Sequence, residues 1–313
     1  MPLAPLPGLR LHYLQLSEHA PHQESRPNLV MIHGLAANAA FWYAGGAPAF
    51  TRLGRVILYD LRGHGLSEMP ASGYSAAKMA EDLGLLLDYL DVDDVHLVAH
   101  SFGGSIAIHF ALAHPSRVKS LILADVRLHP VQRQLTFASW PTWPRLRKRL
   151  AAAGVQLDEG DPEAGLHILT ELARLRVSNP VKAKRLHQIV LGAPAGFGGV
   201  RGARRWLKLL ETTSAYAEFT AAPEFRPSDL SLLRQPILAV FGEHSMAMAS
   251  ARAISRQCAQ ARLEIVPRAG HFFPLSRKKA FVQASVRFLT AEAGLIREST
   301  TRTRSGRNAS AFS

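Results

Sequence analysis

The fold is decided by residues 98–104, which read Val98-Ala99-His100-Ser101-Phe102-Gly103-Gly104. They follow a short apolar run and open a helical pattern, so Ser101 falls on a tight turn between a strand and a helix. Such a turn needs small residues two places before and after the serine, and Ala99 and Gly103 meet that need. The turn exposes the hydroxyl and directs helix N–H groups toward developing negative charge. Ser101 is therefore predicted to be a nucleophile; a serine that only caps a helix is the alternative.

Short apolar runs alternate with helical patterns along the chain. Each run is bounded by polar, Gly, Pro or charged residues, as buried parallel strands are. The alternation predicts an α/β fold, with a mostly parallel central sheet and helices on both faces. The predicted strands cover residues 29–32, 56–59, 95–99, 121–124, 237–241 and 263–266, and the predicted helices of this part cover 76–90, 103–113 and 281–289.

The alternation stops after Asp125 and resumes near Pro236. An interval of roughly a hundred residues is too long for a simple loop. It holds helical patterns with basic faces at residues 145–153, 163–176 and 181–191. The predicted domains are a core formed by residues 1–125 and 236–293, an inserted helical lid at 126–235, and a disordered basic tail at 294–313.

The chain of 313 residues carries a formal charge of +13, which is concentrated in two places. Residues 126–211 contain 15 Lys and Arg against 6 Asp and Glu, and residues 297–313 contain four arginines. The excess favours an acidic or carrier-bound substrate, and a basic surface kept for solubility is equally compatible. Because no recognition helix, zinc-finger spacing or RNA-binding aromatic pattern accompanies the charge, we expect no nucleic-acid partner.

Several sequence features indicate a cytoplasmic protein without a membrane span. No stretch of 18 residues is uniformly apolar, and residues 1–16 lack the pattern of a secretory signal. Cys258 is the single cysteine, which excludes an internal disulfide and fits a reducing compartment. The motifs of metal sites and of phosphate-binding or dinucleotide-binding loops are missing, so we expect neither a metal nor a cofactor. The oligomeric state stays open.

A second motif, residues 33–38, follows the predicted strand at 29–32 and reads His-Gly-Leu-Ala-Ala-Asn. The glycine lets the backbone turn, so that a main-chain N–H can face the serine. We expect the N–H groups of Leu35 and Phe102 to form an oxyanion hole, the pair of donors that stabilises negative charge on a reacting carbonyl oxygen. His33 itself is interpreted as a structural hydrogen-bonding residue.

A third motif, residues 267–273, lies just beyond the last predicted strand and contains His271. A histidine on this loop can reach over the sheet edge and take the proton of Ser101. His100 is next to the serine, but neighbouring side chains alternate along a strand, so we expect it to point the other way.

Together these motifs resemble the α/β-hydrolase superfamily, in its lid-bearing branch of esterases, lipases, thioesterases and carbon–carbon bond hydrolases. The resemblance covers residues 9–291 and rests on His33-Gly34, on residues 60–67 (Asp-Leu-Arg-Gly-His-Gly-Leu-Ser), on the serine turn and on Gly270-His271. It implies a serine hydrolase that cleaves an ester, thioester or related acyl bond of a small molecule through a Ser-His-Asp triad and an acyl-enzyme. An acyltransferase would need the same residues. A non-catalytic binding protein that has lost its acid is a further alternative.

The acid of the expected triad is out of place. The family commonly places it three residues after the glycine that ends a late strand, and here that position holds Ser245. Asp125, which lies 24 residues after Ser101, occupies a position that carries the acid in some members of the superfamily. Glu243 and the absence of any functional acid are the alternatives. We expect Asp125 to serve, because the strands ending at Asp125 and Phe241 should be neighbours and open toward the loop of His271.

Overall fold

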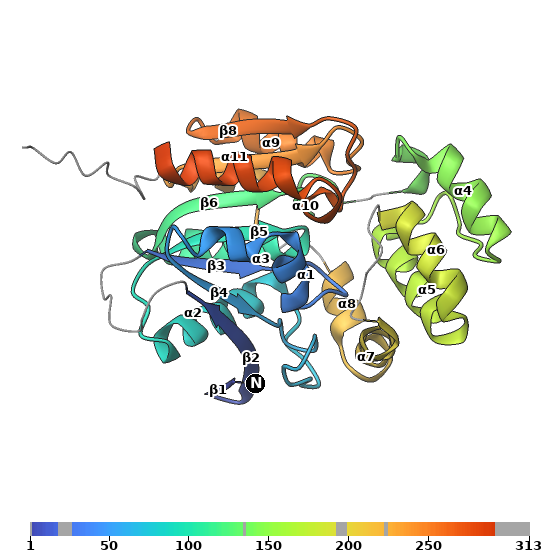
Figure 1. Ribbon diagram of the computed structural model, residues 1–313, viewed down its shortest axis with the longest axis horizontal. Coiled ribbons are helices and arrows are strands. Elements are labelled where there is room, and N and C mark those ends of the chain that lie inside the picture. Colours follow the sequence, from blue (N-terminus) through green and yellow to red (C-terminus); the bar gives the residue numbers. More distant parts are fainter. Residues whose placement is uncertain (1, 18–26, 134–135, 192–198, 222–224, 292–313) are drawn as a thin grey trace, which may run out of the picture.

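The computed structural model describes residues 2–17, 27–133, 136–191, 199–221 and 225–291, so the predicted tail at 294–313 lies outside the described residues. A sheet of eight strands forms its centre, in the order β1-β2-β4-β3-β5-β6-β7-β8 (Figure 1). β2 runs antiparallel to both β1 and β4, and all pairs from β4 to β8 are parallel. The predicted α/β class with a mostly parallel sheet is confirmed.

The strands are β1 (Leu3–Leu6), β2 (Leu9–Leu16), β3 (Asn28–Ile32), β4 (Arg55–Tyr59), β5 (Val95–His100), β6 (Val118–Ala124), β7 (Ile237–Gly242) and β8 (Ala261–Val266). The helices before β6 and after β7 are α1 (Ala39–Gly45), α2 (Ala76–Tyr89), α3 (Phe102–Ala113), α9 (Met248–Gln257), α10 (Phe273–Ser276) and α11 (Lys278–Ala291). Those between β6 and β7 are α4 (Trp143–Ala152), α5 (Ala164–Ser178), α6 (Pro180–Leu191), α7 (Gly199–Thr212) and α8 (Ala215–Thr220). Short 3-10 helices are η1 (Ala47–Phe50), η2 (Pro115–Arg117), η3 (Phe137–Ser139) and η4 (Pro227–Leu232).

The β1–β2 hairpin extends the sheet beyond the predicted strands. Its turn contains Gly8, whose φ of 69° lies in the left-handed region that favours glycine. Along β1 the burial alternates, with Ala4 and Leu6 inside and Leu3 exposed. A half-buried edge hairpin lacks the continuous apolar run that marks the central strands, which is why it was not predicted.

Helices cover both faces of the sheet, as the side chains of β3 make clear. Val30 and Ile32 belong to the hydrophobic cluster that includes α2 and α3. Leu29 and Met31 point the opposite way, into a cluster built from α1 and α11. Because alternate residues of one strand face opposite sides, β3 and its neighbours are buried on both faces. None of the helices in the described part of the chain is long and apolar enough to cross a bilayer.

β6 and β7 are adjacent parallel strands, as predicted, although the chain between them is long. This interval contains helices α4 to α8, which lie together at one end of the sheet in Figure 1. Its apolar side chains, among them Leu172 and Trp206, join the hydrophobic cluster of the α2–α3 face. The inserted helices therefore share a core with the sheet.

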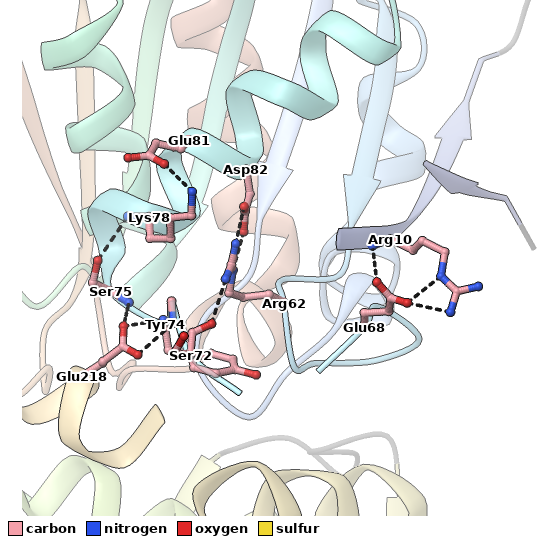
Figure 2. A network of polar contacts seen from close by, with 11 residues as sticks. Arg10, Arg62, Glu68, Ser72, Tyr74, Ser75, Lys78, Glu81, Asp82 and Glu218 are labelled. Atoms are coloured by element: carbon pink, nitrogen blue, oxygen red, sulfur yellow. Dashed lines mark hydrogen bonds and ion pairs between the residues drawn. The ribbon is translucent and has the colours of Figure 1, made fainter. Parts of the chain in front are cut away.

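A carboxylate also connects the inserted helices to the segment that precedes α2 (Figure 2). Glu218 of α8 accepts hydrogen bonds from the backbone N–H groups of Gly73, Tyr74 and Ser75, at 2.9, 2.6 and 3.0 Å. Ser75 in turn caps the N-terminus of α2, where its hydroxyl accepts from the N–H of Lys78. Partial burial raises the pKa of Glu218, but these bonds and that from Ser214 outweigh it, and the net pKa is lowered.

Candidate active site

Ser101 occupies a strained turn between β5 and α3. Its φ of 55° and ψ of −124° lie outside the regions that a serine ordinarily adopts. The helix that follows packs closely on β3, because a Cβ at Gly103 would lie 2.6 Å from the carbonyl oxygens of both Ile32 and His33. Only glycine fits there, and this close packing holds the serine at the end of the strand.

The structure brings Ser101, His271 and Asp125 into one line of hydrogen bonds. The Ser101 hydroxyl donates to Nε2 of His271 at 3.0 Å, and Nδ1–H of His271 donates to Oδ1 of Asp125 at 2.8 Å. His271 lies on the loop after β8, and Asp125 directly follows β6. Asp125 is fully buried, with a positive φ of 48°.

Asp125 has two further donors, both from the end of β7. The N–H of Gly242 donates to Oδ2 at 2.9 Å, and the hydroxyl of Ser245 donates to Oδ1 at 2.5 Å. Ser245 thus contacts the carboxylate instead of the imidazole. Glu243 is engaged elsewhere, since its Oε2 accepts from the N–H of Arg268 at 2.7 Å.

His33 orients the peptide group that carries the N–H of Leu35. Its Nδ1–H donates to the carbonyl of Gly34 at 2.7 Å, and its Nε2 accepts from the N–H of Leu61 at 3.1 Å. The Gly34 carbonyl and the Leu35 N–H belong to one planar trans peptide and point in opposite directions. Burial, opposed by the charge of Asp60, lowers the pKa of His33, so the ring stays neutral and can play both roles.

The backbone N–H groups of Leu35 and Phe102 are available for a ligand. Among the described residues, neither N–H takes part in a hydrogen bond within the protein. Gly34 brings the two segments together, because a Cβ on it would lie only 2.9 Å from Cβ of Ser101. Two free donors next to a serine hydroxyl form a site that can accept a carbonyl oxygen.

His100 has a contact that the alternation of strand side chains did not reveal. Its Nε2–H donates to the backbone carbonyl of His271 at 3.0 Å, and the two imidazole rings have their centroids 4.7 Å apart. Phe41 stacks on the ring, with centroids 4.6 Å apart. Burial, assisted by the nearby His271, holds the pKa of His100 well below its usual value, so the ring is neutral. His100 therefore helps to fix the loop that carries His271.

A cavity of about 480 Å³ opens from Ser101 and His271 toward the inserted helices. Its wall combines aromatic and aliphatic side chains, namely Phe102, Trp140, Leu146, Leu166, Ile168, Leu169, Phe219, Phe225 and Met246. Charged side chains also reach it, namely Arg127, Arg145, Arg149, Glu163 and Glu218. Within the described ranges, no group of His, Cys, Asp and Glu has the arrangement of a metal site. The cavity is large enough for a small organic ligand next to the serine.

The comparison with protein families agrees with this geometry. Residues 27–278 match the model of the alpha/beta hydrolase fold. The chain belongs to the α/β-hydrolase family. Its fold is also similar to that of the enol-lactonase from Burkholderia xenovorans LB400, at 22% identity and a TM-score of 0.63, over 92% of this chain and all of the other.

Among the relatives with named activities are a carbamate hydrolase and an esterase. A putative carbamate hydrolase of Caulobacter is 25% identical over 88% of this chain and 95% of its own length. A pimeloyl-[acyl-carrier protein] methyl ester esterase of Aeromonas hydrophila is 35% identical over 43% of this chain and 49% of its own. An uncharacterized protein of Mycobacterium tuberculosis is 41% identical, and there the chain spans only 29% of the relative's length.

Proposed function

We propose that this protein is a serine hydrolase that cleaves an ester, thioester or related acyl bond, with Ser101, His271 and Asp125 as its catalytic triad. The observation that carries the proposal is the unbroken path of hydrogen bonds from the Ser101 hydroxyl through both nitrogens of His271 to Asp125. It couples a nucleophile to a base and the base to an orienting carboxylate. Relatives named as esterases and carbamate hydrolases are consistent with this chemistry.

In the first half of the reaction, Ser101 Oγ attacks the substrate carbonyl while His271 Nε2 accepts the hydroxyl proton across the 3.0 Å hydrogen bond. The imidazolium that forms is stabilised by the Asp125 carboxylate at Nδ1. Negative charge on the carbonyl oxygen is received by the N–H groups of Leu35 and Phe102, which His33 and the N-terminus of α3 orient. His271 then returns its proton to the leaving group, and the acyl-enzyme remains.

In the second half, water takes the place of the leaving group. His271 removes a proton from this water, which attacks the acyl carbonyl, and collapse of the intermediate releases the acid and restores Ser101. Asp125 is buried, so water does not compete with His271 for its carboxylate. Gly242 and Ser245 donate the further hydrogen bonds that the buried carboxylate accepts. All steps use groups of this chain and water alone.

Residues 126–235 are proposed to act as a lid over a core formed by residues 1–125 and 236–293. Side chains of α4, α5 and α8, such as Leu146, Leu169 and Phe219, supply much of the wall of the cavity. A lid of this kind excludes water and selects the substrate, which accounts for the apolar lining next to Ser101.

The test is a panel of p-nitrophenyl esters and acyl thioesters of increasing chain length, with the wild type and the Ser101→Ala variant assayed side by side. We expect saturable turnover by the wild type for at least one acyl class, and none above background for Ser101→Ala. Equal rates for the two proteins would refute Ser101 as the nucleophile.

A further inference from the structure

Two arginines of α4 face the catalytic cavity. Arg145 and Arg149 are one helical turn apart, so they share a face of the helix, and both line the cavity that begins at Ser101. The helix is anchored by Trp143, Leu146 and Leu150, which are buried in the hydrophobic cluster. The packed helix therefore presents both arginines to the cavity, and each of them is also exposed to solvent.

Neither arginine has a counterion in the part of the chain that the structure describes. The two acidic side chains that line the cavity among the described residues already bind other groups. Glu218 accepts three backbone N–H groups, and Glu163 faces Arg127 at 3.8 Å. Within the described ranges, no acidic side chain therefore pairs with either of these two positive charges in the cavity wall.

The same cavity that the α4 arginines line also has an apolar wall. Phe102 and Phe219 are 5.4 Å apart in edge-to-face contact, and together with Leu166 and Leu169 they form a wall that suits a hydrocarbon chain. The cavity thus offers reacting groups, an apolar wall and a cationic face. A ligand that matches all three has an acyl bond, an apolar segment and a terminal anion.

We propose that Arg145 and Arg149 bind the anionic end of the substrate, and that the substrate is an ester or thioester whose apolar chain ends in a carboxylate or a similar oxyacid anion. Arginine suits this role because its planar, permanently charged guanidinium pairs with two oxygens at once. The inference rests on the proposed function and narrows its substrate class. It differs from a general effect of the basic surface, because only side chains that face the cavity contribute.

The experiment compares two double variants of the same helix. R145Q/R149Q removes the cavity-facing charges. R147Q/K148Q removes two charges from exposed residues of α4 that do not line the cavity, and Arg147 pairs with Glu159 there. Both variants lower the net charge equally, so long-range attraction of an anion falls alike in both.

The readout is the ratio of kcat/KM for a carboxylate-terminated ester to that for a neutral ester of equal length. Two series are used: monomethyl esters of dicarboxylic acids against methyl esters of monocarboxylic acids, and ω-carboxyalkyl acetates against alkyl acetates. They distinguish an anion on the acyl chain from one on the alcohol. The wild type should prefer charged esters in one series, and R145Q/R149Q should lower that ratio about 10- to 100-fold. R147Q/K148Q should keep the wild-type ratio.

Two results would overturn the inference: no preference for charged esters in the wild type, or an equal loss in both double variants. If the wild type hydrolyses no ester at all, the proposed function fails, and binding then decides the inference separately. Calorimetric titration with α,ω-dicarboxylates of increasing length should show binding that R145Q/R149Q loses and R147Q/K148Q retains. Binding that is absent from the wild type, or equal in all three proteins, would contradict it.

Discussion

Ser245 donates its hydroxyl hydrogen to Oδ1 of Asp125 at 2.5 Å, from the position where the family commonly carries its acid. The same oxygen accepts Nδ1–H of His271 at 2.8 Å. Adjacent parallel strands, β6 and β7, bring the two residues together although they are 120 positions apart. In the proposed triad the acid thus follows β6, and Ser245, which follows β7, donates a hydrogen bond to it.

Asp125→Asn should reduce kcat by up to about 10⁴-fold, because an amide can hold the wrong imidazole tautomer and cannot stabilise an imidazolium. Glu243→Gln is the matched control, since Glu243 contacts the backbone of Arg268 instead of His271. The measurement is steady-state hydrolysis of the best ester in the panel. An Asp125→Asn enzyme with near wild-type kcat, or a loss of similar size in Glu243→Gln, would refute Asp125 as the acid.

Ser245→Ala should have a smaller effect, of about tenfold in kcat. The change removes one of three hydrogen bonds to a buried carboxylate but leaves its charge in place. Ser245→Asp replaces this hydrogen-bond donor with a second carboxylate next to Asp125. The repulsion between the two buried carboxylates should strongly destabilise the folded protein. Full activity in Ser245→Asp together with Asp125→Asn would show that either strand can supply the acid.

His33→Asn should lower kcat about 10- to 100-fold while KM changes little, because the Leu35 N–H would lose its fixed direction toward the reacting oxygen. His96→Gln is a useful control, since His96 is also a buried histidine but bonds to Ser120 within the sheet. The separate kcat and KM values of both variants are the measurement. Equal losses of kcat in the two variants would mean that His33 acts only through stability.

The central elements could be predicted because they are buried on both faces. Runs such as residues 121–124 are wholly apolar and bounded by polar residues, which is a local signal of a parallel strand. Ser101, His271 and Asp125 could be chosen as candidates because each lies just beyond a predicted strand. The strands β1 and β2 lack this signal because exposed and partly exposed residues interrupt their buried ones.

The hydrogen bonds around the site and the directions of its side chains could not be predicted from local sequence patterns. The bond from Ser245 to Asp125 depends on the pairing of β6 with β7 and on the turn after β7. That from His100 to the carbonyl of His271 joins residues 171 positions apart. The direction in which Arg145 and Arg149 face also depends on how α4 packs, which their basic composition does not specify.

His96→Gln should make the protein less sensitive to acid. Burial, opposed by Asp94, lowers the pKa of His96 to about 4, against 6.5 when exposed. Below pH 6.5 the unfolded chain therefore binds the proton first, and this group's contribution to stability falls as the pH decreases. When the pH is lowered from about 7.5 to 5.5, the unfolding free energy of the wild type should fall by about 1.4 kcal/mol more than that of the variant. Urea unfolding at both pH values measures this, and equal losses would contradict it.

Glu218→Gln should destabilise the protein by about 1–2 kcal/mol at neutral pH, because the neutral amide is a weaker acceptor for three backbone N–H groups (Figure 2). The pKa of Glu218 is lowered, so the advantage of the wild type is present above pH 4.5 and disappears as acid protonates the carboxylate. Glu211→Gln, on α7, is the control for loss of an exposed negative charge. Equal effects of the two variants at neutral pH would show that the contact does not secure the inserted helices.

The most direct test of the account is the rate at which a fluorophosphonate probe labels Ser101, followed by intact mass and peptide mapping. Fluorophosphonates react quickly only with a serine that a base has activated. We expect one adduct per chain, on the peptide that carries Ser101, with labelling abolished in Ser101→Ala and slowed by orders of magnitude in Asp125→Asn. Absence of an adduct in the wild type, or an adduct that forms equally fast in Asp125→Asn, would contradict it.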